Sequence, residues 1–347
     1  MVSIVSIIVA ILIFSFIIIF HELGHFSMAK AFDVRVNEFT LGLGPTIFSV
    51  QGKETKFCLN LLPFGGSCVM EGEDEESDDE RAFNKKPLWQ KFIIVFAGPL
   101  FNFILAFLLS LIFIGAMGYD KPMVEDVMEG YPAEEAGLQS GDEILSLNGF
   151  HIHFYNEVTV YTFFHTGQAL NVEYERDGKV YNTTITPKYN EESGRYLLGI
   201  QGNTTRVKGN ALTVVKYSFY EIRYQIYVTL QSLKMLFTGQ LGVQDMSGPV
   251  GIVKTIGDSY TEASNYGVLI TVMQMISIAI LLTANLGVMN LIPFPALDGG
   301  RLVIFLIEGV TRRKIDERVE GGINFVGFAL LMMLMVVVMI SDISKLF

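Results

Sequence analysis

The sequence contains little charge and little cysteine. Only 18% of its 347 residues are charged, whereas 50% are hydrophobic and the mean hydropathy is +0.41. This composition lies outside the usual range of a soluble globular protein and favours a membrane protein. The two cysteines, Cys58 and Cys68, lack CxxC spacing. Their number and spacing argue against a disulfide framework and against a cysteine metal site.

The negative charge of the chain is concentrated in one place. The formal net charge is −11, and eight of the ten residues at 71–80 (EGEDEESDDE) are acidic. A run of this kind usually forms a solvated loop. We therefore infer no partner from the excess of acidic residues.

Long apolar runs are abundant. Those with the roughly 20 residues needed to cross about 30 Å of hydrocarbon are 2–27, 92–118, 268–292 and 323–341. The first has no positively charged start and no small-residue cleavage site, so we interpret it as a retained span and not as a secretory signal.

Lysine and arginine indicate the orientation of these spans. Residues 31–87 contain six of them and 301–318 contain five, whereas the C-terminal tail has only Lys345. By the positive-inside rule both connecting segments are cytoplasmic. Both termini and the region 119–267 are then predicted to lie outside.

The segments between the spans have different patterns. Residues 34–73 alternate in places and contain glycine turns, which predicts a small antiparallel sheet shielded by the spans. Residues 119–190 predict a compact domain of short strands. Residues 209–238 predict an amphipathic helix on the membrane, with a fifth span as the alternative. The predicted divisions are 1–33, 34–73, 74–91, 92–118, 119–190, 191–267, 268–300, 301–322 and 323–341.

The motif HELGH at the end of the first span predicts a zinc site. His21 and His25 are one helical turn apart, so two imidazoles can converge on one Zn²⁺ while Glu22 acts as general base on a water. The alternative is a chance pair of histidines at the end of a span. Ionisable residues are costly in that setting, which favours the functional interpretation.

A catalytic zinc site normally has three protein ligands and one open position. The strongest third candidate is Asp298 in NLIPFPALDGGR, where two prolines and two glycines predict irregular backbone at the membrane edge. A helix cap is its alternative role. Because the first and third spans both end on the cytoplasmic side, His25 and Asp298 are expected at one depth.

Several motifs follow one another in a characteristic order, namely HELGH, AGPLFN at 97–102, PAEEAGLQSGDEILSLNG, SGPVGI at 247–252 and NLIPFPALDGG. Over nearly the whole chain they resemble the site-2 protease family of intramembrane zinc metalloproteases, peptidase family M50, and its bacterial RseP-like members. One PDZ signature is present here, whereas RseP carries two. This difference points to another type of bacterial host and leaves the chemistry unchanged.

The resemblance implies a polytopic α-helical membrane protein with about four transmembrane helices, a membrane-associated β-sheet loop and one extracytoplasmic PDZ-like α+β domain. It implies that His21, His25 and Asp298 are the Zn²⁺ ligands and that Glu22 is the catalytic acid/base. It also implies that Asn290, and a second asparagine, Asn285, contact the substrate backbone. The implied substrates are single-span membrane proteins, such as anti-sigma factors or signal-peptide remnants. The implied location is the bacterial inner membrane, with the active site near the cytoplasm.

Other interpretations remain open. A catalytically silent scaffold would bind partners through the PDZ-like domain, and a transporter would show internal repeats that are not found here. The PDZ-like domain itself either binds extended peptides or excludes bulky substrates. His151, His153 and His165 lack a carboxylate or cysteine at ligand spacing, which favours surface histidines over a second metal site.

Overall fold

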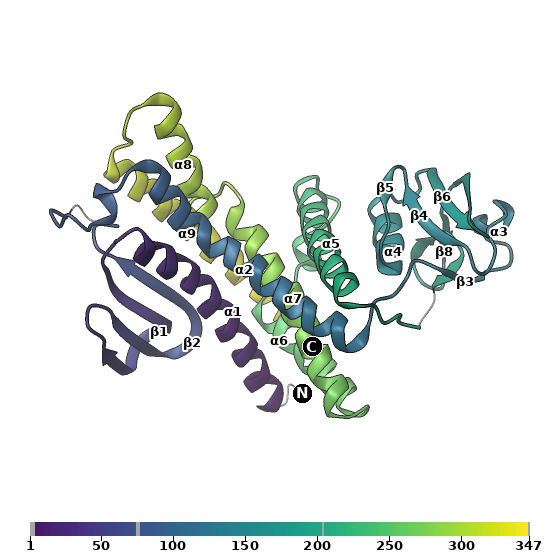
Figure 1. Ribbon diagram of the computed structural model, residues 1–347, viewed down its shortest axis with the longest axis horizontal. Coiled ribbons are helices and arrows are strands. Elements are labelled where there is room, and N and C mark those ends of the chain that lie inside the picture. The colour runs from purple at the N-terminus through teal and green to yellow at the C-terminus, as the bar shows by residue number, and fades with distance from the viewer. Residues whose placement is uncertain (1–3, 74–76, 203–204, 346–347) are drawn as a thin grey trace. The chain divides into compact units, whose positions relative to one another are not determined.

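The computed structural model describes residues 4–73, 77–202 and 205–345, so residues 74–76 of the acidic run lie outside it. Contacts divide the chain into two units (Figure 1). The first, called here the membrane unit, is Met1–Leu109 with Ser232–Phe347. The second, called the domain unit, is Ser110–Gln231.

The predicted four long apolar helices are confirmed. They are α1 (Ile4–Ala31), α2 (Leu88–Met117), α7 (Val268–Leu291) and α9 (Glu317–Ser344). Helix α2 follows Pro87, whose fixed φ suits a helix start. Asp316 caps α9 by accepting a hydrogen bond from the Arg318 amide. Each helix is long and apolar enough to cross a membrane.

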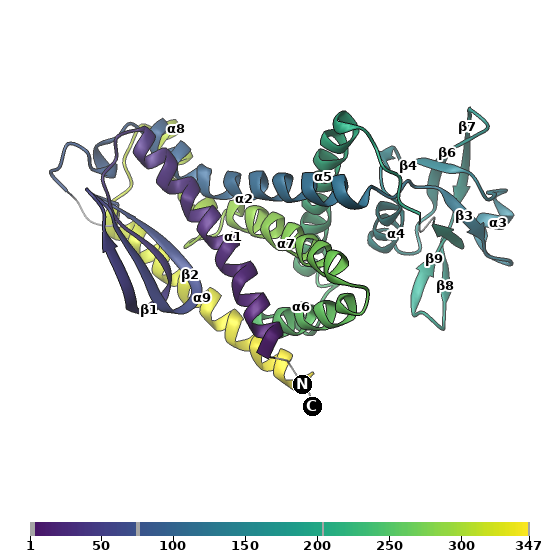
Figure 2. The ribbon, with the colours of Figure 1, turned by 60° about the horizontal axis from the view of Figure 1, so that its bottom comes forward.

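The predicted sheet between the first two spans consists of β1 (Val36–Gln51) and β2 (Lys56–Met70), which pack beside α1 (Figure 2). Both strands are long and irregular. Thr40 pairs with Cys58 and also with Ser67, and Leu41 has two partners in the same way. Residues 38–41 of β1 therefore have neighbours on both sides, and residues 66–70 of β2 form one edge of the sheet.

Shorter helices complete the membrane unit. These are η1 (Phe83–Lys85), η2 (Val243–Asp245), α6 (Pro249–Ser264) and α8 (Asp298–Thr311). The SGPVGI segment opens α6, where the Gly251 amide donates to the carboxylate of Asp342 on α9 at 2.7 Å. A Cβ on Gly257 would lie 2.5 Å from the Ser6 hydroxyl, so glycine allows α6 to approach α1 closely. Helix α6 thus contacts both the first and the last long helix.

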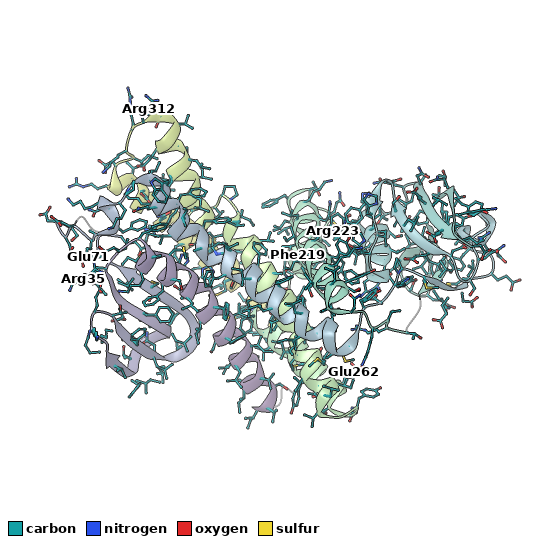
Figure 3. The ribbon with its side chains drawn as sticks, viewed as in Figure 1. Arg35, Glu71, Phe219, Arg223, Glu262 and Arg312 are labelled. Carbon is teal, nitrogen blue, oxygen red and sulfur yellow. The ribbon has the colours of Figure 1, made fainter. Side chains whose placement is uncertain are left out.

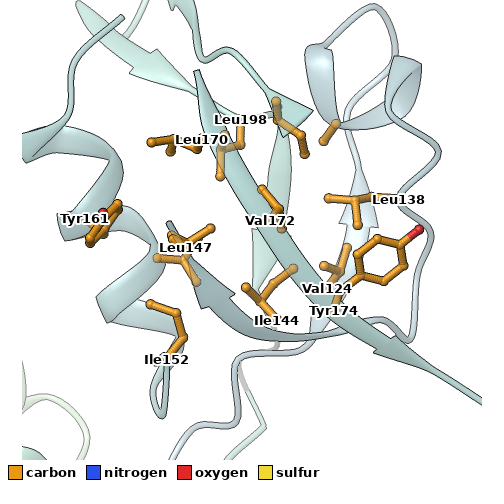
Figure 4. Close-up of a cluster of buried hydrophobic side chains, with 13 residues drawn as sticks. Val124, Leu138, Ile144, Leu147, Ile152, Tyr161, Leu170, Val172, Tyr174 and Leu198 are labelled. Atoms are coloured by element: carbon orange, nitrogen blue, oxygen red, sulfur yellow. The ribbon is translucent and has the colours of Figure 1, made fainter. Parts of the chain in front are cut away.

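The domain unit contains short strands and helices around one apolar core (Figure 4). Strands β5, β4, β6 and β7 form an antiparallel sheet in that order, while β10 pairs with β3 and β8 with β9. The elements are β3 (Val124–Val127), α3 (Pro132–Glu135), β4 (Glu143–Leu147), β5 (Phe150–His151), α4 (Tyr155–Phe164), β6 (Leu170–Arg176), β7 (Lys179–Ile185), β8 (Lys188–Asn190), β9 (Arg195–Leu197) and β10 (Ile200–Gly202). We call residues 124–202 the PDZ-like domain, after its sequence signature.

Helix α5 (Ala211–Phe237) follows the PDZ-like domain as one continuous helix. It is not among the four helices of the described chain that are apolar enough to span a membrane. Leu212, Phe219 and Leu230 are exposed on it. At 100° per residue they fall on one stripe, as an amphipathic helix requires. That α5 lies on the membrane stays a prediction.

Candidate metal centre

The two motif histidines lie on the last third of α1. His21 and His25 are each 8% exposed, and their Nε2 atoms are 3.3 Å apart. Residues four apart on a helix lie on the same face, so the spacing in the sequence produces this convergence directly. The apolar part of α1 precedes them and the helix ends at Ala31. The histidine pair is therefore near one end of a candidate span.

Asp298 comes from a different part of the chain. Helix α7 ends at Leu291, and the proline-containing segment that follows includes Ala296 with φ of 72° before α8 starts at Asp298. This turn directs the carboxylate at the histidines. Oδ2 of Asp298 lies 3.3 Å from Nε2 of His21 and 3.5 Å from Nε2 of His25. All three ligand atoms fall within 4.8 Å of one another.

These distances fit a tetrahedral metal. With metal–ligand bonds of about 2.0–2.1 Å, two ligands at a tetrahedral angle are about 3.3–3.4 Å apart. The observed separations of 3.3, 3.3 and 3.5 Å match that value. Oδ2 of Asp298 is buried, and no described group donates a hydrogen bond to it. A carboxylate oxygen facing two imidazole nitrogens in this way has the chemistry of a zinc ligand.

The position of Asp298 in its helix favours a carboxylate. Asp298 lies in the first turn of α8, where the helix dipole favours an anion. The cluster therefore offers one anionic and two imidazole ligands.

The other imidazole nitrogens contact helix α2. Nδ1 of His25 lies 2.9 Å from the carbonyl oxygen of Ile94, so Nδ1–H donates and Nε2 keeps its lone pair for a metal. Nδ1 of His21 lies 3.0 Å from Nδ2 of the fully buried Asn102, whose Oδ1 has no hydrogen-bond partner among the described residues. The oxygen and nitrogen of an amide are assigned from its hydrogen-bond network. Exchanging these two atoms lets Oδ1 accept from Nδ1–H of His21, which gives His21 the same tautomer as His25.

Two glycines allow α1 and α2 to come this close. A Cβ on Gly98 would lie 2.2 Å from Nε2 of His25, and one on Gly24 would lie 2.3 Å from the carbonyl oxygen of Ala97. Neither position has room for a larger residue. The segment AGPLFN therefore supplies both the space and the Asn102 amide. From the sequence, Gly98 with Pro99 indicates a kink or a close helix approach and Asn102 indicates a hydrogen bond between helices, but the sequence does not place either contact at the metal centre.

The cluster opens into a cavity of about 250 Å³. Glu22 lines it together with the edge segment of β2, and the other lining residues include Val95, Glu73 and Arg301. A Cβ on Gly66 would lie 3.0 Å from Cγ of Glu22, so glycine brings the sheet edge against this carboxylate. A carboxylate, a metal-type cluster and an open strand edge thus share one cavity.

The two predicted asparagines differ in their placement. The amide nitrogen of Asn290, near the end of α7, lies 3.4 Å from Nε2 of His21. Asn285 is on the same helix and partly buried, but it is not among the described residues that line the cavity. The structure therefore brings Asn290 to the cluster and leaves Asn285 one and a half turns away.

The acidic run is more than a solvated loop. The Glu73 side chain is 14% exposed and forms an ion pair with Arg301, three residues after Asp298. Glu71 accepts hydrogen bonds from Asn37 and Ser77. One end of the run is therefore built into the wall of the cavity, which the composition of the run alone did not indicate.

Comparison with known proteins gives consistent matches over the full length. The model described as Peptidase family M50 matches residues 9–334. A Clostridium acetobutylicum protein, named provisionally as a zinc metalloprotease, is 37% identical over 98% of both chains. Zinc metalloprotease RasP of Geobacillus kaustophilus is 31% identical (99% of this chain, 98% of the relative). Regulator of sigma-W protease RasP of Bacillus subtilis is 28% identical over 99% of both chains.

A solved structure also matches about a quarter of the chain. The PDZ domain of the SdrC-like protein from Listeria monocytogenes is 22% identical, with a TM-score of 0.22. The match covers 24% of this chain and 88% of that structure.

Proposed function

The chain belongs to peptidase family M50, the site-2 protease family of intramembrane zinc metalloproteases, and from this premise we propose how its residues cleave a peptide bond within a membrane. His21, His25 and Asp298 hold Zn²⁺, and Glu22 is the catalytic acid/base. The observation that carries this assignment is the convergence of three ligand atoms within 4.8 Å at one end of an apolar helix. Glu22 lines the same cavity.

The steps assigned to the chain are proton transfers and positioning. Zinc, when bound, supplies Lewis acidity that activates water and polarises a carbonyl. Glu22 takes a proton from the attacking water and returns it to the leaving amine. Asn102 and the Ile94 carbonyl hold the imidazoles in the tautomer that leaves Nε2 available. Glu22 is one residue from His21, so both groups act from one rigid helix.

The substrate is a transmembrane segment that has to unwind. Peptide bonds in a helix are protected by their own hydrogen bonds, and unwound backbone in a membrane needs other partners. Residues 66–70 form an edge of the β-sheet, and residues 67–70 line the cavity beside Glu22. We assign to this edge the role of pairing with an unwound substrate strand.

Asparagine amides offer the substrate further contacts. Asn290 lies beside His21 and is assigned a hydrogen bond to the substrate backbone. Asn285 is assigned the same role nearer the middle of α7, where it would meet a more distant part of the substrate. Normal cleavage by an Asn290→Ala variant would remove that residue from the account.

We infer the location from charge. Lysine and arginine in 31–87 and 301–318 support a cytoplasmic position for both segments by the positive-inside rule. The metal centre then lies near the cytoplasm of a bacterial inner membrane, and the PDZ-like domain lies outside. Single-span proteins are the proposed substrates. The PDZ-like domain either binds their extended segments or excludes bulky ones.

Oxidative cross-linking tests strand addition at the cavity. Val69 is 42% exposed on the edge segment, so a Val69→Cys variant in an inactive Glu22→Gln chain lacking Cys58 and Cys68 provides one thiol there. A model single-span substrate with cysteine at successive positions is the partner. Cross-links at every second substrate position are expected, because strand side chains alternate.

A matched control uses the other part of the sheet. Phe48 is 62% exposed and pairs with Leu59, away from the cavity. Phe48→Cys in the same background should give no periodic cross-links. Cross-links every three to four positions would mean that the substrate stays helical. Equal patterns from both variants would contradict the assigned edge.

A further inference from the structure

A second and larger cavity lies in the membrane unit and is called here the cationic chamber. Its volume is about 670 Å³, and its lining includes seven lysine or arginine residues and four carboxylates. Among the described lining residues the balance is three positive charges, whereas the whole chain carries −11. The chamber is therefore a local exception to the charge of the protein.

The carboxylates of the chamber already have partners. Glu73 pairs with Arg301, and Asp78 lies 3.6 Å from the Lys85 amine. Glu308 accepts a hydrogen bond from the backbone amide of Ile315 at 2.8 Å. Glu320 lies 3.9 Å from Arg301, and Lys91 lies over the Phe83 ring. The other cations are Lys86 before α2 and Arg312, Arg313 and Lys314 after α8. Among the side chains that the structure describes, no carboxylate forms an ion pair with these four.

The chamber lies at the level where spans end. Leu88 and Lys91 of the chamber belong to the first turn of α2, whose helix dipole places positive potential there. The cluster 312–314 lies between α8 and the long helix α9, and Figure 3 shows Arg312 projecting from that turn. Trp89 is 56% exposed beside Leu88. Tryptophan is enriched where a span meets the headgroup layer.

We propose that the cationic chamber binds the phosphate headgroup of an anionic membrane phospholipid. Phosphate oxygens accept charge-assisted hydrogen bonds from arginine and lysine, and basic pockets between transmembrane helices bind such headgroups. Binding of a soluble phosphate would not require the chamber to lie at a span end. Binding of an acidic peptide would not require an exposed tryptophan beside the chamber. The position at a span end favours the lipid. Glu73 and Arg301 line both this chamber and the catalytic cavity, so the headgroup would lie next to the metal centre's outer wall.

Trp89 provides a built-in reporter, because it is the sole tryptophan of the chain. The full chain is reconstituted in phosphatidylcholine vesicles that contain either brominated phosphatidylglycerol or brominated phosphatidylcholine. Bromine quenches the fluorescence of Trp89 when the lipid lies beside it. We expect phosphatidylglycerol to quench at a roughly ten- to hundredfold lower mole fraction, since each lysine or arginine contributes about fivefold near an anionic lipid.

Two triple variants separate the chamber from general charge attraction. The first, Arg312→Gln with Arg313→Gln and Lys314→Gln, should quench equally with both lipids. The second, Arg35→Gln with Lys53→Gln and Arg318→Gln, removes the same number of positive charges, two from 31–87 and one from 301–318, outside the chamber lining and should keep the preference. The unquenched emission maximum of Trp89 confirms that each variant is folded.

Three outcomes would overturn the proposal. Equal quenching of the unmodified chain by both lipids would mean that no anionic headgroup binds. Loss of the preference in both triple variants would indicate general attraction. Abolition of the preference by millimolar glycerol phosphate or by a soluble acidic peptide would assign the chamber to those ligands instead of a lipid.

Discussion

Asp298 of the membrane unit differs in its partners from the buried carboxylates of the domain unit. In the domain unit, Asp142 is fully buried with Arg176 at 2.7 Å, and Glu157 is 1% exposed with Arg223 at 2.6 Å. In the membrane unit, Asp298 faces two imidazoles and no described lysine or arginine pairs with it. An arginine neutralises a buried carboxylate permanently, whereas two imidazoles leave its charge available to a metal. The partner of a buried carboxylate thus separates a structural role from a functional one.

The two units also differ in how far their apolar side chains are exposed. The domain unit encloses Ile144, Leu147 and Leu170, which are at most 1% exposed. The membrane unit exposes large apolar side chains such as Ile4 and Val268 and buries Asn102 and Ser6. Lipid accepts the exposed apolar surface, so polar groups inside the bundle are retained for binding or contact between helices.

Removal of the Asp298 carboxylate should have the largest effect. Asp298→Asn keeps the shape but removes the anionic ligand, so bound zinc should fall from about one per chain to near zero and cleavage should be undetectable. Metal analysis and a single-span substrate assay measure both. Asp258→Asn, at an exposed position on α6, is the control and should change neither. Full zinc content in Asp298→Asn would contradict the ligand assignment.

Closing the space between the helices should have the next largest effect. A methyl group at Gly98 would overlap His25, so Gly98→Ala should displace the imidazole and lower cleavage roughly hundredfold. Gly115→Ala is a matched control in the same helix, where the nearest atom lies 4.0 Å away. Equal activity of the two variants would show that α1 and α2 are less closely packed than described.

The hydrogen bond to His21 should have a smaller effect. Asn102→Ala removes the partner of Nδ1, and loss of such a contact to a metal-bound histidine typically costs ten- to a hundredfold in metal affinity or activity, so about that loss is expected. Zinc titration against a chelator and the cleavage assay measure it. Ser110→Ala, another fully buried polar site in α2, should retain wild-type affinity. If both variants behave alike, Asn102 only fills space.

Breaking an arginine pair in the domain unit should change stability and leave the chemistry intact. Arg223→Met removes the cationic partner of the buried Glu157 and leaves it the amides of His153 and Phe154. It should cost about 2 kcal/mol, less than loss of a fully buried partner, because Arg223 is 36% exposed. Limited proteolysis at increasing temperature should show that the domain unit unfolds at a temperature about 10 °C lower than in the wild type. Zinc content should stay the same. The exposed Lys179→Met is the control, and a loss of zinc in Arg223→Met would break the comparison between the units.

Much of the metal centre could be predicted from the sequence. HELGH has helical spacing, Asp298 follows a proline-interrupted span, and the four spans differ strongly from the rest in hydropathy, so each is a local signal. The roles of Gly98 and Asn102 depend on where α1 crosses α2, and the Glu73–Arg301 pair joins residues 228 apart. The double pairing of Thr40 depends on the turns of the sheet. Such contacts arise from tertiary packing, and no local pattern specifies them.

The measurement that tests the central claim most directly combines metal content with activity. Wild type and Glu22→Gln are purified in detergent, zinc per chain is quantified, and cleavage of a model single-span substrate is assayed. The account predicts about one zinc in both proteins and cleavage in the wild type alone, since glutamine cannot accept the proton of the attacking water. No zinc in either protein, or equal cleavage by both, would contradict it and favour a silent scaffold.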